Sequence, residues 1–526
     1  MGMRITSAMI NNRSKTNIFG TKTLTDKYNE QMTSQKKIEK PSDDPVVAIR
    51  SLRLRDSLHE VEQYTDKNIP DASSWLSVTE TSLNNVSNVL KEIYGMCVNG
   101  STGTLTTDDR NTILSNLSAY VDQIYSEGNT EYAGRTIFTG FKTNKTLTFQ
   151  EATPNLRYSI DQKLSFENIE TGTYSKNLLA FPMSAQDMLN NVPKIEDEYE
   201  SVHIDRIRLA YKEIDSATAP TIKLLNKDTG ELMDIDLSVV CVTTNDLEAA
   251  GYDLDALAAP LYPDDDTKDP YAADAADRPG GNIILNTETG ELLLPDAEYF
   301  KKNNIQIQIA YDKTGFDDGE VRPEMLFDCR EYDEFDVVKN TFKREAQDIN
   351  YTVAGNQLLN VNTQASQDGV FTTTIRRDVE ELMNAVTAAQ KANEKVDYIK
   401  TLLENPMYAD EDSQSKFKTW LTAAEKEVTY TTENLKDIFS KGITKFQDYK
   451  QTVDLAKTDV GSREKRLELT KTRMTAQKSS LQNLIHTNED REMSDILIDF
   501  ETAYQAYEAS LKAASEVNKM SLLNFL

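Results

Sequence analysis

The sequence of 526 residues has few of the residue types that build catalytic or metal sites, with only three cysteines and three histidines. Cys97, Cys241 and Cys329 have no metal-ligand spacing, so we expect them to be unpaired thiols. The histidines lie in different segments, and neither a nucleophile motif nor a phosphate-binding loop accompanies them. The acidic stretches 264–266 and 312–336 lack the spacing of a calcium-binding loop. We therefore predict no enzyme activity, no cofactor and no metal site.

Long apolar runs and an excess of basic charge are absent as well. No stretch of about 18 apolar residues is present, so no membrane span is expected. The formal net charge is −28, which argues against nucleic acid or an anionic membrane as a partner. Residues 1–25 lack the apolar stretch of a secretory signal. The chain is therefore expected to stay in the cytosol or to leave without signal cleavage.

The C-terminal part contains a regular apolar repeat, which predicts long helices that other helices must cover. One apolar residue recurs every seven positions in the stretch that we call the C-terminal seam: Phe439, Phe446, Val453, Val460, Leu467, Met474 and Leu481. A second stripe follows at spacings of four and three: Met493, Leu497, Phe500, Tyr504, Tyr507, Leu511 and Ala514.

The N-terminal part has a similar but weaker pattern. A helix is predicted from about residue 6 to residue 39, with a mostly polar stripe formed by Ile10, Asn17, Leu24, Gln31 and Ile38. Asp44 suits an N-cap and Pro45 suits the first helical position, so a second helix is predicted to begin there. Pro70 is expected to bend or interrupt that helix.

Helical patterning continues and then fades. An apolar stripe from Leu76 to Cys97 predicts a helix, and Thr106 with Asp109 forms a capping-box pattern that opens the next one. Strand signals dominate from about residue 143 to residue 371. There, 225–232 and 285–292 are similar to each other, and each has the pattern of a hairpin. Helices are predicted again at about 379–403 and from 413 onward.

These patterns predict an α+β protein of three parts. Residues 1–142 and 373–526 are expected to be helical, with their long helices paired in a coiled-coil-like rod. Residues 143–372 are expected to form a β-rich domain inserted at the tip of that rod.

Several segments at the two ends resemble the flagellin superfamily, and within it the members that form the hook–filament junction. The resemblance covers about 3–141 and 453–526. It rests on 37–46 at the first helix break, 51–55, 62–64, 74–76, 129–140, 466–469, 488–490 and the ending 521–526. The break at Pro41 and Pro45 and the ending favour the junction members over flagellin itself. Pro70 and an added helical hairpin at 404–441 depart from the family pattern.

The resemblance implies a structural subunit of the bacterial flagellum, outside the cell and exported by the flagellar apparatus without signal cleavage. The implied partners are hook-associated protein 1 on the hook side, flagellin on the filament side, copies of the chain in a ring, and an export chaperone. Filament flagellin is the alternative within the family. A surface or phage-tail adhesin, whose acidic β-rich middle binds a ligand, is the alternative from another class.

The predicted assembly interface combines the N-terminal helix, the first helix break and the C-terminal tail. We expect the tail to pack on the N-terminal helix after assembly, because burying its apolar side chains outweighs the entropy of ordering them. The interface residues are Ile10, Leu24, Pro41, Asp43, Asp44, Pro45, Arg135, Leu511, Leu522, Leu523, Phe525 and Leu526.

Overall fold

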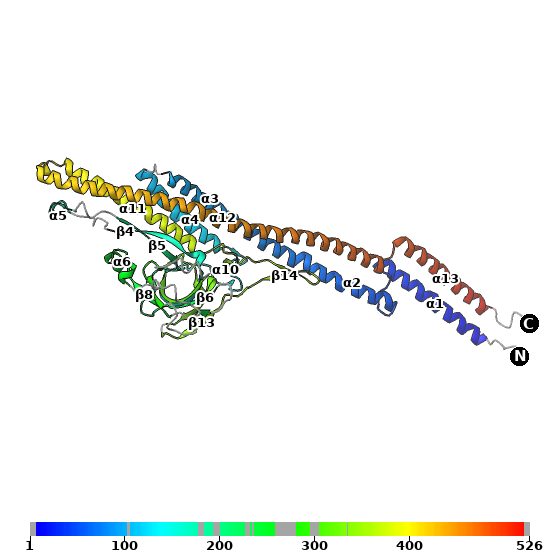
Figure 1. Cartoon of the computed structure of the whole chain (residues 1–526). Helices are drawn as coiled ribbons and strands as arrows, with labels where there is room; N and C mark the ends of the chain where they lie inside the picture. Colours follow the sequence, from blue (N-terminus) through cyan, green and yellow to red (C-terminus); the bar gives the residue numbers. More distant parts are fainter. Residues whose placement is uncertain are drawn as a thin grey trace, which may run out of the picture. The chain divides into compact units, whose positions relative to one another are not determined.

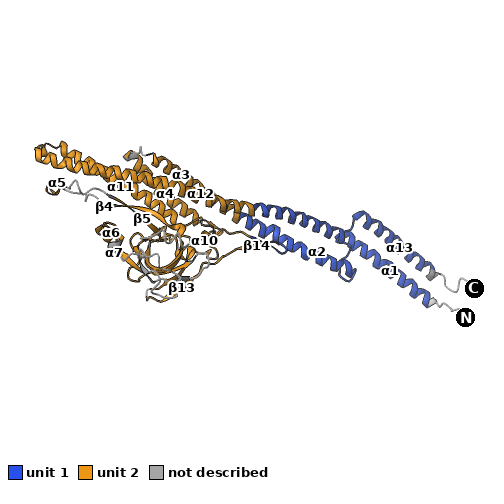
Figure 2. Cartoon of the chain, viewed as in Figure 1, with its two compact units in different colours: residues 1–74, 350–359, 464–526 blue, residues 75–349, 360–463 orange. Residues whose placement is uncertain are grey.

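The computed structural model describes residues 7–102, 106–176, 184–192, 200–226, 232–233, 236–257, 280–294, 305–333 and 335–519. The chain forms two compact units, coloured separately in Figure 2. Unit 1 contains 1–74, 350–359 and 464–526, and unit 2 contains 75–349 and 360–463. Each unit thus combines segments from both halves of the sequence.

In unit 1, helices from opposite ends of the chain pack in antiparallel fashion. α1 (Ser7–Ser34) lies beside α13 (Met493–Lys519), as Figure 1 shows. The hydroxyl oxygens of Thr21 and Ser510 are 3.1 Å apart, and the guanidinium of Arg491 lies 5.6 Å from the ring centroid of Tyr28. These two contacts fix the direction of the pair.

The predicted stripe on the first helix is wrong for its first three members. Ile10, Asn17 and Leu24 are exposed, while Gln31 is buried. A strict seven-residue spacing drifts by about 20° per heptad on a straight helix, and α1 has too few apolar residues to mark one face. The half-buried residues on the rest of α1 are Ser14, Ile18, Thr21, Thr25 and Tyr28.

The second stripe, on α13, divides between two faces. Half-buried Phe500, Tyr507 and Ala514 share a face with the buried Ile496 and Ala503. The remaining members are exposed: Met493, Leu497, Tyr504 and Leu511. An apolar stripe with alternating spacings of four and three is wider than the area that a single partner helix covers.

The second helix of unit 1 begins as predicted. α2 (Pro45–Gln63) is capped by Asp44, whose side chain accepts the N–H groups of Val46 and Val47 at 3.0 and 3.2 Å. One π-helical turn, η1 (Tyr64–Asn68), separates α2 from α3 (Ile69–Ser101). The expected interruption at Pro70 is thus confirmed as a π-helical turn, in which the helix continues with one turn of altered hydrogen bonding.

A small hairpin completes unit 1 and ties two helical segments together. β14 (Asn350–Ala354) and β15 (Gln357–Asn360) pair with each other. Asn68 donates to the carbonyl of Thr352 at 2.8 Å on one side of the hairpin. On the other side, Gln357 donates to Thr470 at 3.1 Å.

The C-terminal seam lies on one unbroken helix, α12 (Glu411–Glu489). The first six seam residues are at most 5% exposed, and only Leu481 is half-buried. The seam is confirmed, but the predicted helix from 413 to 440 is the first part of the same helix. α11 (Thr373–Glu404) ends at Asn405–Pro406 as predicted, and η4 (Pro406–Tyr408) connects it to α12.

Unit 2 packs α3, α11, the first part of α12 and α4 (Thr107–Gly128) together. Two glycines allow close helix approach: a Cβ added at Gly100 would lie 2.6 Å from the Phe439 ring, and one at Gly442 would lie 3.0 Å from Cys97 Sγ. The capping box of Thr106 and Asp109 opens α4 as predicted. A two-residue pair, β1 (Glu131–Tyr132) and β2 (Arg135–Thr136), follows it.

Two sheets in unit 2 form the predicted β-rich middle. The six-stranded sheet has the order β13-β12-β3-β11-β6-β7, and the five-stranded sheet has the order β4-β5-β10-β9-β8. Only β8 and β9 pair in parallel among the described strands. One apolar core joins the sheets, with Ile160, Ile307 and Leu292 among its buried members. The α+β class, with long helices from both ends packed together and a β-rich middle, is confirmed.

The strands and short helices of the middle have defined bounds. The six-stranded sheet contains β3 (Thr153–Ser165), β6 (Thr221–Asn226), β7 (Leu232–Met233), β11 (Ile305–Phe316), β12 (Asp328–Tyr332) and β13 (Val338–Phe342). The five-stranded sheet contains β4 (Glu170–Lys176), β5 (Glu200–Arg208), β8 (Asp236–Val242), β9 (Gly280–Asn286) and β10 (Glu291–Leu293). The short helices are η2 (Phe166–Asn168), α5 (Ala185–Asn190), α6 (Thr244–Ala249), α7 (Leu254–Leu257), α9 (Pro323–Leu326) and α10 (Ala365–Asp368).

The sequence repeat corresponds to two hairpins. Leu225 pairs with Leu232 across β6 and β7, and Asn286 pairs with Glu291 across β9 and β10. The two hairpins belong to different sheets. The three-part division into 1–142, 143–372 and 373–526 stays a prediction.

Candidate assembly site

The helix breaks of the two chain ends meet in unit 1. α1 ends at Ser34, α12 ends at Glu489, and the segments after them pair through an isolated antiparallel bridge between Lys36 and Asp490. Lys37 N–H donates to the Glu489 carbonyl at 2.7 Å, and Arg491 N–H donates to the Gln35 carbonyl at 3.0 Å. We call this region the helix-break site; it consists of Gln31, Gln35–Lys37, Ser51, Arg55 and Glu489–Arg491.

The carboxylate of Glu489 is the centre of the helix-break site. Its side chain is 6% exposed, and Arg55 donates to its two oxygens at 2.8 and 2.6 Å. Lys36 Nζ donates at 2.9 Å, and the Ser51 hydroxyl donates as well. These hydrogen bonds, the one from Arg55 foremost, hold the pKa of Glu489 well below its ordinary range. The carboxylate therefore joins α1, α2 and α12 as a fixed negative charge.

Buried polar groups next to Glu489 explain the polar pattern of the first helix. Gln31, 5% exposed, donates to the Lys37 carbonyl at 2.6 Å and accepts from Arg491 at 3.1 Å. Arg491 also pairs with Asp499 of α13. A buried amide is tolerated only when its hydrogen bonds are made, so Gln31 fixes one docking of α1 onto the second break.

The segment before α2 is locally preformed. The Asp43 side chain accepts the N–H groups of Glu39 and Lys40 at 3.1 and 3.0 Å, and these bonds lower the pKa of Asp43. Asp44 caps α2, and Pro45 occupies its first turn, where no N–H is needed. Pro41 is exposed in the turn between them. This geometry sets the direction in which α2 leaves the break.

The remaining predicted interface residues lie apart from the helix-break site. Ile10, Leu24 and Leu511 are exposed on α1 and α13, at 40%, 42% and 42%. Arg135 belongs to unit 2, where its guanidinium lies 4.9 Å from the ring centroid of Trp75. The predicted tail residues lie outside the described residues: Leu522, Leu523, Phe525 and Leu526.

The sequence analysis missed Lys36, Ser51, Arg55 and Glu489 as site residues. Their segments carried the resemblance, but no pattern along the chain pairs Arg55 with a residue 434 positions later. One signal was available. A glutamate at the last position of a helix is unfavourable beside the helix dipole, which indicates a compensating cation nearby.

Unit 1 also exposes many large apolar side chains. We call them the outer apolar surface: Met9, Ile10, Phe19 and Leu24 of α1, Val46, Ile49 and Leu52 of α2, Leu469 and Leu484 of α12, and Met493, Leu497, Ile498, Tyr504 and Leu511 of α13. Scattered exposed leucines are ordinary, but a concentration of them on a few helices indicates an interaction surface. Val46, Ile49 and Leu52, which recur every three residues, were not predicted.

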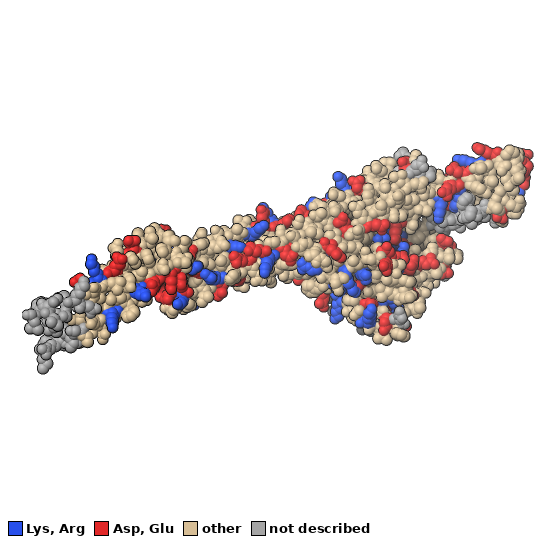
Figure 3. Space-filling view, turned by 180° about the vertical axis from the view of Figure 1, so that it is seen from behind, with Lys and Arg blue, Asp and Glu red and all other residues tan. Residues whose placement is uncertain are grey.

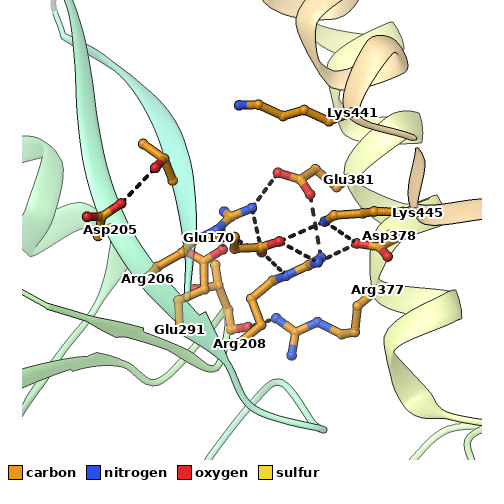
Figure 4. Close-up of polar contacts among 12 residues, drawn as sticks. Glu170, Asp205, Arg206, Arg208, Glu291, Arg377, Asp378, Glu381, Lys441 and Lys445 are labelled. Carbon is orange, nitrogen blue, oxygen red and sulfur yellow. Dashed lines mark hydrogen bonds and ion pairs between the residues drawn. The ribbon is translucent and has the colours of Figure 1, made fainter. Parts of the chain in front are cut away.

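A buried charged cluster in unit 2 joins the five-stranded sheet to α11 and α12 (Figure 4). It consists of Glu170, Arg206, Arg208, Glu291, Asp378, Glu381 and Lys445. Arg206 donates to Glu291 at 2.6 Å, and it also pairs with Glu381 of α11. Arg208 pairs with Glu170 and Asp378.

Asp378 is the most buried acid of the charged cluster, at 3% exposure. Lys445 and the Tyr449 hydroxyl donate to it at 2.8 and 2.6 Å. Burial opposes its charge, but Arg208 and Lys445 hold the pKa of Asp378 below the ordinary value. Because each acid of the charged cluster is paired with a cation, the arrangement supplies attachment between sheet and helices.

Two surveys of the described residues support the emphasis on assembly. Within them, no group of three metal-ligating side chains is placed to hold an ion, and no helix is long and apolar enough to cross a membrane. On the face shown in Figure 3, Lys and Arg side chains are interspersed with Asp and Glu. The basic stretch on α12 is engaged locally, since Arg463 donates to Asn360 and Lys478 to Asp66.

Comparison with known proteins identifies the N-terminal part of the chain. Residues 5–143 match the family model of the bacterial flagellin N-terminal helical region. This part of the chain is a flagellin-type helical region. The resemblance inferred from the sequence is thereby confirmed, and it includes the first helix break, α2, α3 and α4.

The relatives of this flagellin-type region have a narrower name. Flagellar hook-associated protein 3 of Escherichia coli (strain K12) is 31% identical over 150 residues, 28% of this chain and 47% of that protein. The protein of the same name from Salmonella typhimurium is 30% identical over 152 residues, 29% of this chain and 47% of the relative. The chain thus spans about half the length of the curated relatives it matches.

A solved structure, the flagellar junction protein FlgL from Legionella pneumophila, aligns over 85% of this chain and 100% of its own. Its sequence identity is 13% and its TM-score is 0.27. A likeness of that size does not bear on the arrangement of the parts.

Proposed function

We propose that this chain is a structural subunit of the bacterial flagellum at the hook–filament junction. It links hook-associated protein 1 on the hook side to flagellin on the filament side, with copies of itself arranged in a ring. It reaches the outside of the cell through the flagellar export apparatus, with an export chaperone and without signal cleavage. Its role is mechanical, and no reaction is assigned to it.

The observation that supports this proposal most strongly is the helix-break site. Two segments that carry the sequence resemblance, 37–46 and 488–490, lie far apart in the chain and meet around Glu489. Fixing both breaks together holds α1 with α13 and α2 with α12 as one unit. A subunit that transmits force between two tubes requires such a connection between its chain ends.

The outer apolar surface supplies the means of assembly. Fourteen large apolar side chains remain exposed on four helices of unit 1. Covering one such side chain fully contributes about 1.5–3 kcal/mol, so partial burial of several outweighs the cost of association. Ile10, Leu24 and Leu511 belong to this surface, which agrees with their predicted place in the assembly interface.

Polymerisation of the purified chain distinguishes the junction from the filament. Flagellin polymerises alone into long filaments, whereas a junction subunit forms only short or ring-like species. We expect negative-stain electron microscopy of the purified full chain to show the short species. Long filaments grown from this chain alone would instead identify it as a filament flagellin.

The adhesin alternative makes a different prediction. An adhesin would bind a ligand through the acidic β-rich middle, and its loss would abolish attachment while flagellar filaments stay on their hooks. We expect the reverse, with filaments lost and no ligand bound by the middle.

A further inference from the structure

The turn between β12 and β13 in unit 2 presents an aromatic side chain to solvent. Phe335 is 84% exposed, and its neighbours Val337 and Val338 are 59% and 45% exposed. We call these three residues the β12–β13 knob. β13 is an edge strand of the six-stranded sheet, and its first four residues are exposed. The knob has no part in the helical contacts described above.

The knob is held in one conformation by polar contacts. The Asp333 side chain accepts the N–H groups of Phe335 and Val337, both at 2.9 Å. Asp333 N–H donates to the Val337 carbonyl at 3.0 Å, and Asp336 adopts a left-handed conformation with φ of 59°. Arg157 pairs with Asp336. A preformed turn loses little entropy on binding, which suits a side chain that anchors an interface.

Unit 2 also has a cavity of about 340 Å³ beside the charged cluster, between β4 and α12. Its apolar lining comes from Leu382, Ile438 and Phe446, and Thr171, Thr173 and Thr444 contribute hydroxyl groups. The volume is near the lower end of the range for ligand pockets, which fits a single aromatic side chain. We call it the β4–α12 cavity.

Lys441 gives the cavity a cation that can take a new partner. Its side chain also lines the cavity, and Figure 4 shows it extending from α12 past Glu381. It pairs with Asp437 at 2.8 Å, but both side chains are about half exposed, at 49% and 54%. An exposed pair of this kind contributes little, so exchanging its carboxylate partner is inexpensive.

We propose that the β12–β13 knob of one copy inserts Phe335 into the β4–α12 cavity of a second copy. The aromatic ring contacts Leu382, Ile438 and Phe446, while the exposed carboxylates beside Phe335 face Lys441. Charge complementarity and size therefore both favour a second copy as occupant. β13 and β4 are edge strands of different sheets, so each copy offers a knob at one place and a cavity at another.

The contact is heterologous, because different surfaces of the two copies meet. Heterologous contacts close into rings when the rotation between copies permits. The inference therefore rests on the proposed function for its biological setting, since that function places copies of the chain in a ring. The contact itself involves only unit 2, whereas the proposed assembly through the outer apolar surface involves unit 1.

Photocrosslinking of the full chain tests the contact directly. Phe335 is replaced by benzoylphenylalanine, and isotope-labelled and unlabelled copies are mixed so that links between copies can be distinguished by mass. We expect links between copies that map to residues 438–446. The same replacement at Met407, which is 76% exposed on η4, is the matched control and should give no link to that segment. Links that form only within one copy, or elsewhere, would overturn the inference.

Two variants complete the experiment. T444W fills the cavity from an exposed position and should reduce the specific link at least tenfold, by an order-of-magnitude estimate for losing an aromatic anchor. K441E should reduce it by no more than about fivefold, as expected for one exposed charge. Unchanged linking in T444W, with a normal circular dichroism spectrum, would contradict the proposed pocket. Strains that retain filaments without this link would reject the inference alone and leave the proposed function standing.

Discussion

Arg55 of α2 donates hydrogen bonds from two nitrogens to both carboxylate oxygens of Glu489, the last residue of α12, at 2.8 and 2.6 Å. The two residues are 434 positions apart, and Glu489 is nearly buried while Arg55 is half exposed. A bidentate pair of this kind fixes angle as well as distance. It therefore determines how the N-terminal and C-terminal helices of unit 1 join.

Replacing the carboxylate should loosen the helix-break site locally. E489Q keeps the side-chain shape but removes the charge that Arg55 and Lys36 contact. Hydrogen bonds to charged groups contribute about 1.5–3 kcal/mol, so amide exchange of residues 35–43 should rise by about 10- to 100-fold. Hydrogen–deuterium exchange with mass spectrometry measures this. E468Q, which removes an exposed pair with Lys465 on the same helix, is the control and should change little.

The same carboxylate predicts a pH dependence of stability. The folded pKa of Glu489 lies well below the ordinary value of about 4.3, mainly because of the hydrogen bond from Arg55. A depressed folded pKa contributes stability that is present above the unfolded pKa and is lost as pH falls toward the folded one. The stability difference between wild type and E489Q should therefore be largest above about pH 5 and shrink below pH 4. Urea unfolding followed by circular dichroism tests this; a difference independent of pH would contradict it.

The charged cluster should be the electrostatic attachment of the β-rich middle to the helices. D378N leaves Arg208 and Lys445 without their buried carboxylate, which should cost about 3–5 kcal/mol. Both tryptophans, Trp75 and Trp420, belong to unit 2, so tryptophan fluorescence during urea unfolding reports on this unit. D437N, which breaks only the exposed pair with Lys441, should leave the unfolding midpoint nearly unchanged. Equal effects of the two variants would argue against a role for burial.

The C-terminal tail is predicted to act in assembly and not in folding. Deleting residues 521–526 should leave the melting temperature of the monomer nearly unchanged but abolish filament retention on the cell. Circular dichroism and motility assays measure the two effects separately. A monomer that melts many degrees earlier, together with normal retention, would show that the tail belongs to the folded core.

The β-rich middle is predicted to be dispensable for assembly of the helical part. Deleting residues 149–340 should leave a chain that still assembles and keeps its helical signal in circular dichroism. The deletion removes the sheet side of the charged cluster, and Asp378 retains Lys445 and Tyr449 as partners. Loss of helical content would show that the sheets stabilise the helices around them.

Local chemistry in the sequence was sufficient for the elements whose signals are local. The cap at Asp44, the capping box at Thr106, the hairpins at 225–232 and 285–292 and the seam from Phe439 to Met474 all follow from neighbouring residues. The stripe on α1 was misplaced because its face is set by polar contacts such as the one between Thr21 and Ser510, which apolar periodicity does not reveal.

The sites could not be predicted in the same way, because they depend on residues that are distant in sequence. Glu489 with Arg55, and Asp378 with Arg208, are ordinary charged residues until the fold brings them together. Pro41 to Pro45 was recognised because a helix break has a local signature. The residues that hold this break in place have none.

Electron microscopy of a strain that lacks this gene tests the proposed junction function most directly. The account predicts intact hooks, with filaments shed into the medium, and filaments restored on the hooks when the full-length gene is returned. Filaments that remain attached in the deletion strain would contradict it, and so would hooks that fail to form.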